Sequence, residues 1–145
     1  MSASRRQKRP ATSAREAALI RAASQARTHA YAPYSTFRVG AAVQTQSGTI
    51  YTGANVENAS YGLAMCAERV AIHKAISAGH RRLVTVSIVA DGEALTMPCG
   101  ACRQVMVEFG VLRVIVATPK GRRRTRTLRQ LLAEPFLPDR LPRSR

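Results

Sequence analysis

The chain is predicted to be an α/β protein built on a mixed sheet, because segments that suit strands alternate with segments that suit helices. Two apolar runs rich in β-branched residues, 83–90 and 112–117, have the composition of strands buried on both faces. A helical pattern precedes each run, at 66–78 and 99–109, and a glycine follows each helix. A chain of 145 residues is long enough for one domain with a substantial core.

The first helix is expected at 14–29. Ser13 followed by Glu16 is typical of a capping box, in which both side chains bind N–H groups at the start of a helix. The segment is rich in alanine and carries enough larger apolar residues for one buried face. Pro33 lies just beyond it and turns the chain out of the helix.

A hairpin and a C-terminal strand and helix complete the predicted fold. Residues 37–46 alternate as a strand does, Gly48 lies in a tight turn, and 49–53 returns as the second strand. Near the C-terminus we expect a short basic strand at 123–127 and a helix that begins at Leu128.

The net charge of +15 is concentrated at the two ends of the chain. Residues 1–15 and 119–145 carry most of the excess, whereas 16–118 is only slightly basic. Basic ends raise the non-specific affinity for nucleic acid. Because the middle of the chain carries little of the excess charge, a solvated surface is favoured over a dedicated nucleic-acid-binding role.

One domain is predicted at 13–138, with a disordered basic tail at 1–12 and a second basic tail at 139–145. No apolar run is long enough to cross a bilayer, so no membrane partner is expected. Reduced cysteines and the lack of a recognisable signal segment predict a cytoplasmic location.

All three cysteines lie in two short motifs, Cys66-Ala67-Glu68 and Pro98-Cys99-Gly100-Ala101-Cys102. Three thiolates can hold zinc tetrahedrally and leave a fourth position open for water, as in catalytic sites. No histidine lies at a spacing that would close the site. Glu68 is then placed to move protons on and off that water.

Both cysteine motifs are expected at helix N-termini, with Cys66 opening one helix and Cys99 and Cys102 opening another. The helix dipoles and free N–H groups there lower the pKa of thiols. Arg69, on the same helix face as Cys66, adds a positive charge behind the ligands.

Other uses of the cysteines are less consistent with the sequence. An odd number of cysteines leaves one unpaired in a disulfide framework. A redox pair at Cys99 and Cys102 has the right spacing, but it leaves Cys66 and Glu68 without a role. The full set favours a metal site.

Further motifs run in order around the two cysteine motifs. They are Tyr31-Ala32-Pro33-Tyr34-Ser35, Phe37-Arg38-Val39-Gly40-Ala41-Ala42, Gly53-Ala54-Asn55-Val56-Glu57-Asn58-Ala59-Ser60-Tyr61, Arg69 after Glu68, Arg103-Gln104 after Cys102, and Leu131-Leu132-Ala133-Glu134-Pro135-Phe136. From about residue 15 to 138, the chain resembles the small, homotetrameric cytidine deaminases that bind zinc through three cysteines. Ala133 departs from this pattern, because proline is usual there.

The resemblance implies a three-layer α/β/α sandwich with about five strands in a mixed sheet. It implies one Zn²⁺ per subunit, held by Cys66, Cys99 and Cys102, with Glu68 as the catalytic proton carrier. The reaction implied is hydrolytic deamination of free cytidine and 2′-deoxycytidine to uridine and 2′-deoxyuridine, with release of ammonia, in pyrimidine salvage.

The resemblance also implies the substrate contacts. Asn55 and Glu57 would bind the ribose 3′-hydroxyl, Phe37 would wall the base, and the N–H of Ala67 would meet the base O2.

Three further residues, Ala59, Tyr61 and Phe136, would complete the site of a neighbouring subunit in a homotetramer. Phe136 is also open to another interpretation, as an anchor of the last helix in the core, because Ala133 could shift the terminal segment.

Three other functions remain as alternatives. A blasticidin-S-type deaminase shares the cysteine motifs, but Arg69 and the segment around Phe136 fit cytidine deaminases better. A nucleic-acid cytosine deaminase usually has histidine as its first ligand, where this chain has Cys66. A non-enzymatic zinc module that binds RNA would have no use for Glu68.

Overall fold

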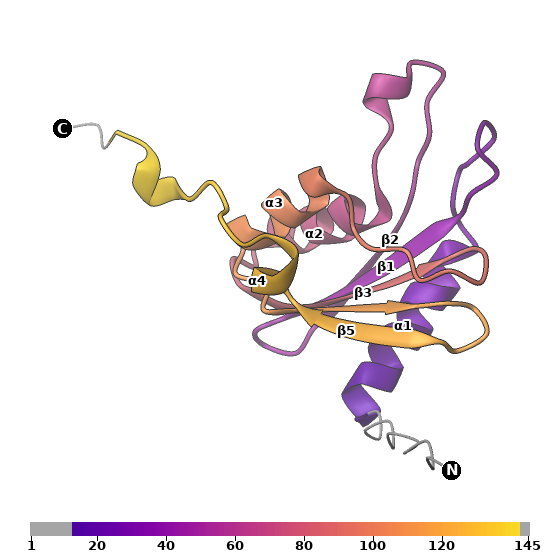
Figure 1. The fold of residues 1–145 in the computed structure, drawn as a ribbon, viewed down its shortest axis with the longest axis horizontal. Helices are drawn as coiled ribbons and strands as arrows, with labels where there is room; N and C mark the ends of the chain where they lie inside the picture. Colours follow the sequence, from indigo (N-terminus) through magenta and orange to yellow (C-terminus); the bar gives the residue numbers. More distant parts are fainter. Residues whose placement is uncertain (1–12, 143–145) are drawn as a thin grey trace, which may run out of the picture.

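The computed structural model describes residues 13–142, which form one mixed sheet with helices on both faces (Figure 1). The strands are β1 (Val39–Thr45), β2 (Ile50–Ala54), β3 (Leu83–Ala90), β4 (Arg113–Ala117) and β5 (Arg123–Thr127). The helices are α1 (Ala14–Arg27), α2 (Ala67–Ser77), α3 (Gly100–Glu108) and α4 (Leu128–Leu131), with the 3₁₀ turns η1 (Tyr61–Leu63) and η2 (Pro138–Arg140).

The strands lie in the order β2-β1-β3-β4-β5. The β3–β4 pair is parallel, and the other three pairs are antiparallel. β3 is the central strand, as its apolar sequence predicts, and all its residues except Val84 are buried. The predicted mixed five-stranded sheet is confirmed.

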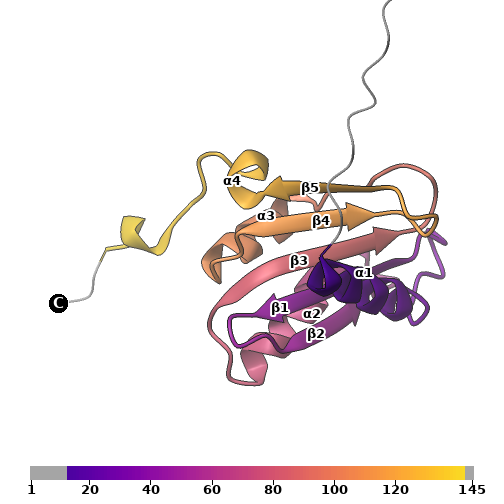
Figure 2. The same ribbon diagram turned by 90° about the horizontal axis from the view of Figure 1, so that it is seen from below.

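Figure 2 shows helices on both faces of the sheet, and a separate cluster of apolar side chains lies on each face. On one face, Leu19 and Ala23 of α1 pack against Ala42 and Val89. The other face is covered by α2 and α3, and it holds the larger cluster, with Ile72, Met106, Val43, Val86 and Val114 among its buried residues. The three-layer arrangement is therefore also confirmed.

Most predicted elements form within two residues of their expected bounds. The differences concern the side-chain partner of Glu16 and two 3₁₀ turns. Ser13 caps α1 as expected, its Oγ accepting from the N–H of Glu16 at 3.2 Å. The carboxylate of Glu16 lies 3.1 Å from Arg113 and so ties α1 to β4. The last helix, α4, is only four residues long. The turns η1 and η2 were not expected.

Two glycines allow the helices to approach the sheet closely. A Cβ atom at Gly40 would lie 2.0 Å from the carbonyl oxygen of Ala23 and 2.4 Å from the nitrogen of Arg27. A Cβ at Gly53 would lie 2.5 Å from the nitrogen of Ala71. Any larger residue would push α1 or α2 away, so both glycines are needed for these helices to pack this closely on the sheet.

The C-terminal part of the chain contributes a basic edge strand and an extended arm. β5 is an edge strand that carries Arg123, Arg124 and Arg126. Beyond α4, residues 132–142 leave the body of the protein as an extended arm in both views (Figures 1 and 2).

The predicted tail at 1–12 and the last three residues of the tail at 139–145 lie outside the described residues. Over residues 13–142, no helix has both the length and the hydropathy needed to span a bilayer.

Candidate active site

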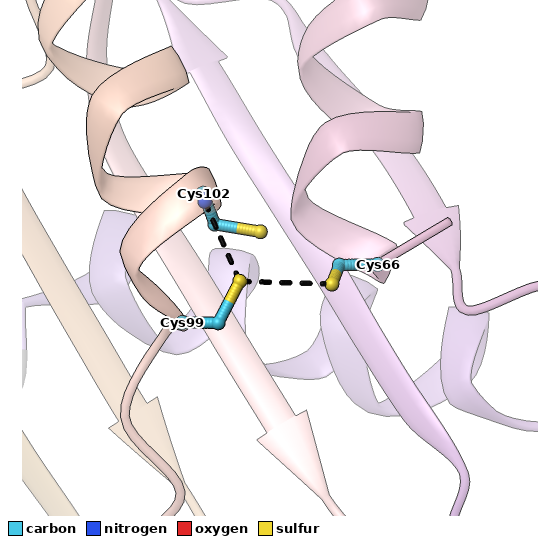
Figure 3. A group of neighbouring side chains, drawn as sticks. All are labelled: Cys66, Cys99 and Cys102. Carbon is cyan, nitrogen blue, oxygen red and sulfur yellow. Dashed lines mark hydrogen bonds between the residues drawn. The ribbon is translucent and has the colours of Figure 1, made fainter. Parts of the chain in front are cut away.

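The three cysteines converge at the N-termini of α2 and α3 (Figure 3). Cys66 is the N-cap of α2, and Cys99 is the N-cap of α3. Cys102 lies one turn into α3, and its N–H donates to Cys99 Sγ at 3.5 Å. The three Sγ atoms lie within 4.8 Å of one another.

This donor set fits zinc. Tetrahedral geometry with Zn–S bonds of about 2.3 Å places two sulfur ligands about 3.8 Å apart. The Sγ atoms of Cys66 and Cys99 are 3.9 Å apart. Cys102 is fully buried, Cys66 is half-buried, and Cys99 is exposed. One side of the cluster therefore faces open space, where a fourth ligand can enter.

The charges around the sulfurs favour a thiolate at Cys66. The neighbouring Cys102 thiol and the guanidinium of Arg69 lower the pKa of Cys66 to about 5. Arg69 Nη2 lies 3.7 Å from Cys66 Sγ. The pKa of Cys102 is raised, because its thiol interacts with Cys66 and is buried, so a second charge there needs a cation nearby. A divalent ion would supply that charge.

Glu68 is buried beside this cluster, in the first turn of α2, with 5% of its surface exposed. Burial raises the pKa of Glu68 to about 7, because the ionised form loses its hydration there. A carboxyl group of this kind can both accept and donate a proton near neutral pH.

A cavity of about 340 Å³ opens over the cluster. The lining residues come from the segment leading into β1, the segment after β2, strand β3, and the two cysteine motifs with the residues just before them. They are Ser35, Phe37, Val39, Asn55, Val56, Glu57, Ala64, Met65, Cys66, Ala67, Glu68, Ile88, Thr96, Met97 and Cys99. The structure therefore brings Phe37, Asn55, Glu57 and Ala67 to the same cavity as Cys66 and Cys99.

The residues of this cavity match a known family. The model of the cytidine and deoxycytidylate deaminase zinc-binding region matches residues 13–118. The chain belongs to this family. The expectation of a zinc-dependent deaminase, which the family resemblance implied, is thereby confirmed.

Relatives support the same assignment. Cytidine deaminase of Halalkalibacterium halodurans is 56% identical over 91 residues, which span 63% of this chain and 69% of that protein. Cytidine deaminase of Sporosarcina psychrophila is 46% identical over 120 residues, 81% of this chain and 88% of the relative. The crystal structure of cytidine deaminase from Burkholderia pseudomallei superposes with a TM-score of 0.79 and 47% sequence identity. The match covers 83% of this chain and 98% of the Burkholderia chain.

In this deaminase chain, the segment before β1 is held by side chains from the opposite rim of the cavity. Asn55 Oδ1 accepts from the N–H of Val39 at 2.8 Å, and Asn55 Nδ2 donates to the carbonyl of Phe37 at 2.9 Å. Ser35 Oγ accepts from the N–H of Phe37 at 3.0 Å and itself donates to Glu57.

The carboxylate of Glu57 faces several donors. It accepts from the N–H groups of Tyr34 at 2.8 Å and Ser35 at 3.2 Å, besides the Ser35 hydroxyl. The hydroxyl of Ser35, and then these N–H groups, hold the pKa of Glu57 below its usual value of 4.5. Glu57 is therefore an anion at the open end of the cavity.

Ala59, Tyr61 and Phe136 do not line this cavity. Tyr61 is 74% exposed, and its ring lies 5.7 Å from the ring of Tyr34. Phe136 lies on the C-terminal arm and is 60% exposed, so it does not anchor a helix in the core of this chain. The carbonyl of Phe136 accepts from Gln104 Nε2 on α3 at 2.7 Å.

Several residues that line the cavity were not predicted as site residues, and Ser35, Thr96 and Met97 are among them. Ser35 ends a motif that was noticed only as part of the family resemblance. Thr96 and Met97 directly precede Pro98-Cys99, so their closeness to a ligand was the available signal. Thr36, between Ser35 and Phe37, has a left-handed backbone with φ of 57°.

Proposed function

We propose that this chain catalyses hydrolytic deamination of free cytidine and 2′-deoxycytidine to uridine and 2′-deoxyuridine, with release of ammonia, in pyrimidine salvage. The observation that carries the proposal is the meeting of three cysteine sulfurs and a buried glutamate at the floor of one cavity. These are the metal-ligand and proton-transfer groups of a zinc-dependent deaminase.

Cys66, Cys99 and Cys102 are the proposed metal ligands. Zn²⁺ bound there would supply Lewis acidity, which makes water a nucleophile near neutral pH. Glu68 accepts a proton from the attacking water and passes it to N3 of the cytosine ring. After water has added at C4, Glu68 takes the proton of the new C4 hydroxyl and gives it to the amino group. The C–N bond then breaks as the C4 carbonyl forms, and ammonia leaves. Arg69 supports the ligand thiolate of Cys66 with its positive charge.

The rest of the cavity suits the base and the sugar. Ala67 is the first residue of α2, where a helix leaves its N–H groups free, so its N–H is available to the base O2. Phe37 supplies an aromatic wall for the base. Asn55 and Glu57 lie at the sugar end, where the Glu57 carboxylate can accept from the 3′-hydroxyl.

A free nucleoside suits this cavity better than a nucleotide. The described cavity lining contains no lysine or arginine, so a phosphate would find no cationic partner there. The anionic Glu57 at the open end would repel it. The same argument disfavours a nucleic-acid substrate, whose chain would extend from the sugar.

Ammonia release by the zinc-loaded protein tests the proposal. We expect turnover of cytidine and 2′-deoxycytidine, and little or none of cytidine 5′-monophosphate, blasticidin S or a cytosine-containing oligonucleotide. Turnover of blasticidin S or the oligonucleotide alone would overturn the substrate assignment and leave the metal site in place. No release from any of them would overturn the enzyme assignment.

The active unit of this proposal is a homotetramer with shared sites. Large apolar side chains are exposed on η1 and the C-terminal arm: Tyr61, Leu63, Phe136 and Leu141 are each more than half exposed. Side chains of this size, grouped on projecting segments, are typical of surfaces that another subunit covers. Ala59, Tyr61 and Phe136 would then complete a neighbour's cavity.

Mixing two variants that each lack one part of the proposed shared site tests the sharing. Glu68→Gln removes the proton carrier, and Phe136→Ala would remove the residue donated to a neighbour. If Glu68 and Phe136 of one site come from different subunits, tetramers that mix the two variants at random restore about a quarter of the wild-type sites. No recovery in tetramers proven to be mixed would mean that Phe136 does not serve a neighbour's site.

A further inference from the structure

Asp91, outside the cavity, joins three separate elements through its side chain. One carboxylate oxygen accepts from Nη1 of Arg27 in α1. The other accepts from the backbone N–H of Arg38 at 3.2 Å and from Arg38 Nε at 3.1 Å. Asp91 directly follows β3, and Arg38 directly precedes β1. The carboxylate therefore lies where α1, β1 and β3 meet.

These bonds continue the sheet beyond its last paired residues. Val39 and Ala90 are the end of the β1–β3 register. Next to them, the N–H of Asp91 donates to the carbonyl of Arg38 at 3.0 Å, and the Asp91 carboxylate takes the N–H of Arg38. A side chain thus replaces the backbone acceptor that a longer strand would have offered.

Asn55 performs the matching role on the other edge of the same segment. Its amide binds the carbonyl of Phe37 and the N–H of Val39. Residues 37–39 are therefore held from the β2 side by Asn55 and from the β3 side by Asp91. Phe37 and Val39 line the cavity, whereas Arg38 is the residue bound by Asp91.

Arg27 makes the position of Asp91 costly to change. Only 15% of the Arg27 side chain is exposed, and Asp91 is the acidic partner with which it forms an ion pair. Arg27 Nε is buried without a hydrogen-bond partner in the described structure. The close approach of α1 at Gly40 brings Arg27 to this point. Without the carboxylate, a largely buried guanidinium would lose its counter-charge.

We propose that Asp91 is a positioning residue for substrate binding, which holds the Phe37 wall of the cavity in place through Arg38 while Arg27 fixes the carboxylate. The proposal rests on the proposed function for its kinetic consequence. Asp91 touches neither the substrate cavity nor the metal ligands. Its removal should therefore weaken nucleoside binding more than it slows the chemical step.

Three variants of the full zinc-loaded protein test this. Asp91→Ala removes every acceptor, and we expect the KM for cytidine to rise about tenfold while kcat changes by less than about threefold. Asp91→Asn keeps an acceptor for the Arg38 N–H but cannot form an ion pair with Arg27. Its KM should therefore lie between those of the wild-type protein and Asp91→Ala. Glu93→Ala is the control. Glu93 lies two residues after Asp91 and forms an exposed ion pair with Lys120, so the KM of this variant should not change.

Amide hydrogen exchange supplies a readout that does not depend on turnover. Asp91→Ala should speed exchange in a peptide covering residues 37–39, with normal zinc content and unchanged exchange in the core of β3. Unchanged exchange at 37–39, or equal losses in zinc content and kcat without a change in KM, would overturn the positioning role. If wild-type protein does not deaminate cytidine, the proposed function fails, and the exchange result still decides whether Asp91 holds this segment.

Discussion

The two ends of the cavity are built in different ways. At the floor, Cys66, Glu68 and Cys102 lie at the starts of two helices that pack on a buried sheet. At the rim, Phe37, Asn55 and Glu57 lie on segments outside the strands and helices. Hydrogen bonds from side chains to backbone hold these rim residues, and Phe37 is 39% exposed.

The floor carries the residues proposed for the chemical step, and the rim carries the residues proposed to bind the substrate. The floor depends on close packing such as that of α2 at Gly53, and it is complete within one chain. The rim depends on a few polar contacts at an open surface, which a neighbouring subunit would cover. Changes at the floor should therefore reduce kcat, and changes at the rim should raise KM.

The largest effect is expected at Glu68. Glu68→Gln keeps the size of the side chain but cannot carry the proton, so kcat should fall by at least about 1,000-fold. Bound zinc, measured by atomic absorption, should stay at one ion per chain. Retained turnover would show that another group carries the proton, and lost zinc would show that Glu68 supports the ligands.

A smaller effect is expected at the rim from Glu57→Gln. The amide accepts weaker hydrogen bonds than a carboxylate, so the KM for cytidine should rise about 10- to 100-fold. Steady-state kinetics should show a much smaller change in kcat. A fall in kcat as deep as that of Glu68→Gln would abolish the distinction between floor and rim.

Thr36 offers a change in the opposite direction. A β-branched residue at a φ of 57° is strained, and asparagine adopts this conformation more readily. Thr36→Asn should raise the free energy of unfolding by about 0.5–1 kcal/mol, measured by denaturant titration. Thr36→Val keeps the branch but loses the hydroxyl, which donates to the carbonyl of Ser35 at 2.6 Å. A gain in both variants would show that the hydroxyl, and not the backbone, limits stability.

The smallest effect is a pH dependence at the rim. Because the native pKa of Glu57 lies below its usual 4.5, its contribution to stability is present above pH 4.5 and lost as the pH falls through the native pKa. Zinc-free wild-type protein should therefore lose its stability advantage over Glu57→Gln on acidification below 4.5. Thermal midpoints at several pH values measure this. A constant difference would mean that the charge of Glu57 does not stabilise the fold.

The sequence predicted what depends on local pattern. The bounds of β3 and β5 and the caps Ser13, Cys66 and Cys99 follow from apolar runs, charges and turn residues near them. Motifs close along the chain located the cysteines and Glu68 in the same way.

Contacts between distant residues could not be read in this way. Arg27 and Asp91 are 64 positions apart, and nothing near either one identifies the other. Glu16 was expected to cap its own helix, but Arg113 offers it a full charge. Arg38 had no assigned role, because its partner is known only once β1 and β3 are paired.

The basic edge strand has a practical consequence for anyone who prepares this protein. The arginines of β5 repel a second edge strand of the same kind. Concentrated samples should therefore resist aggregation by edge-to-edge pairing of sheets. We expect the same arginines to attract cellular RNA at low ionic strength. Such RNA absorbs ultraviolet light where loss of cytidine is followed, so a high-salt wash belongs before the first assay.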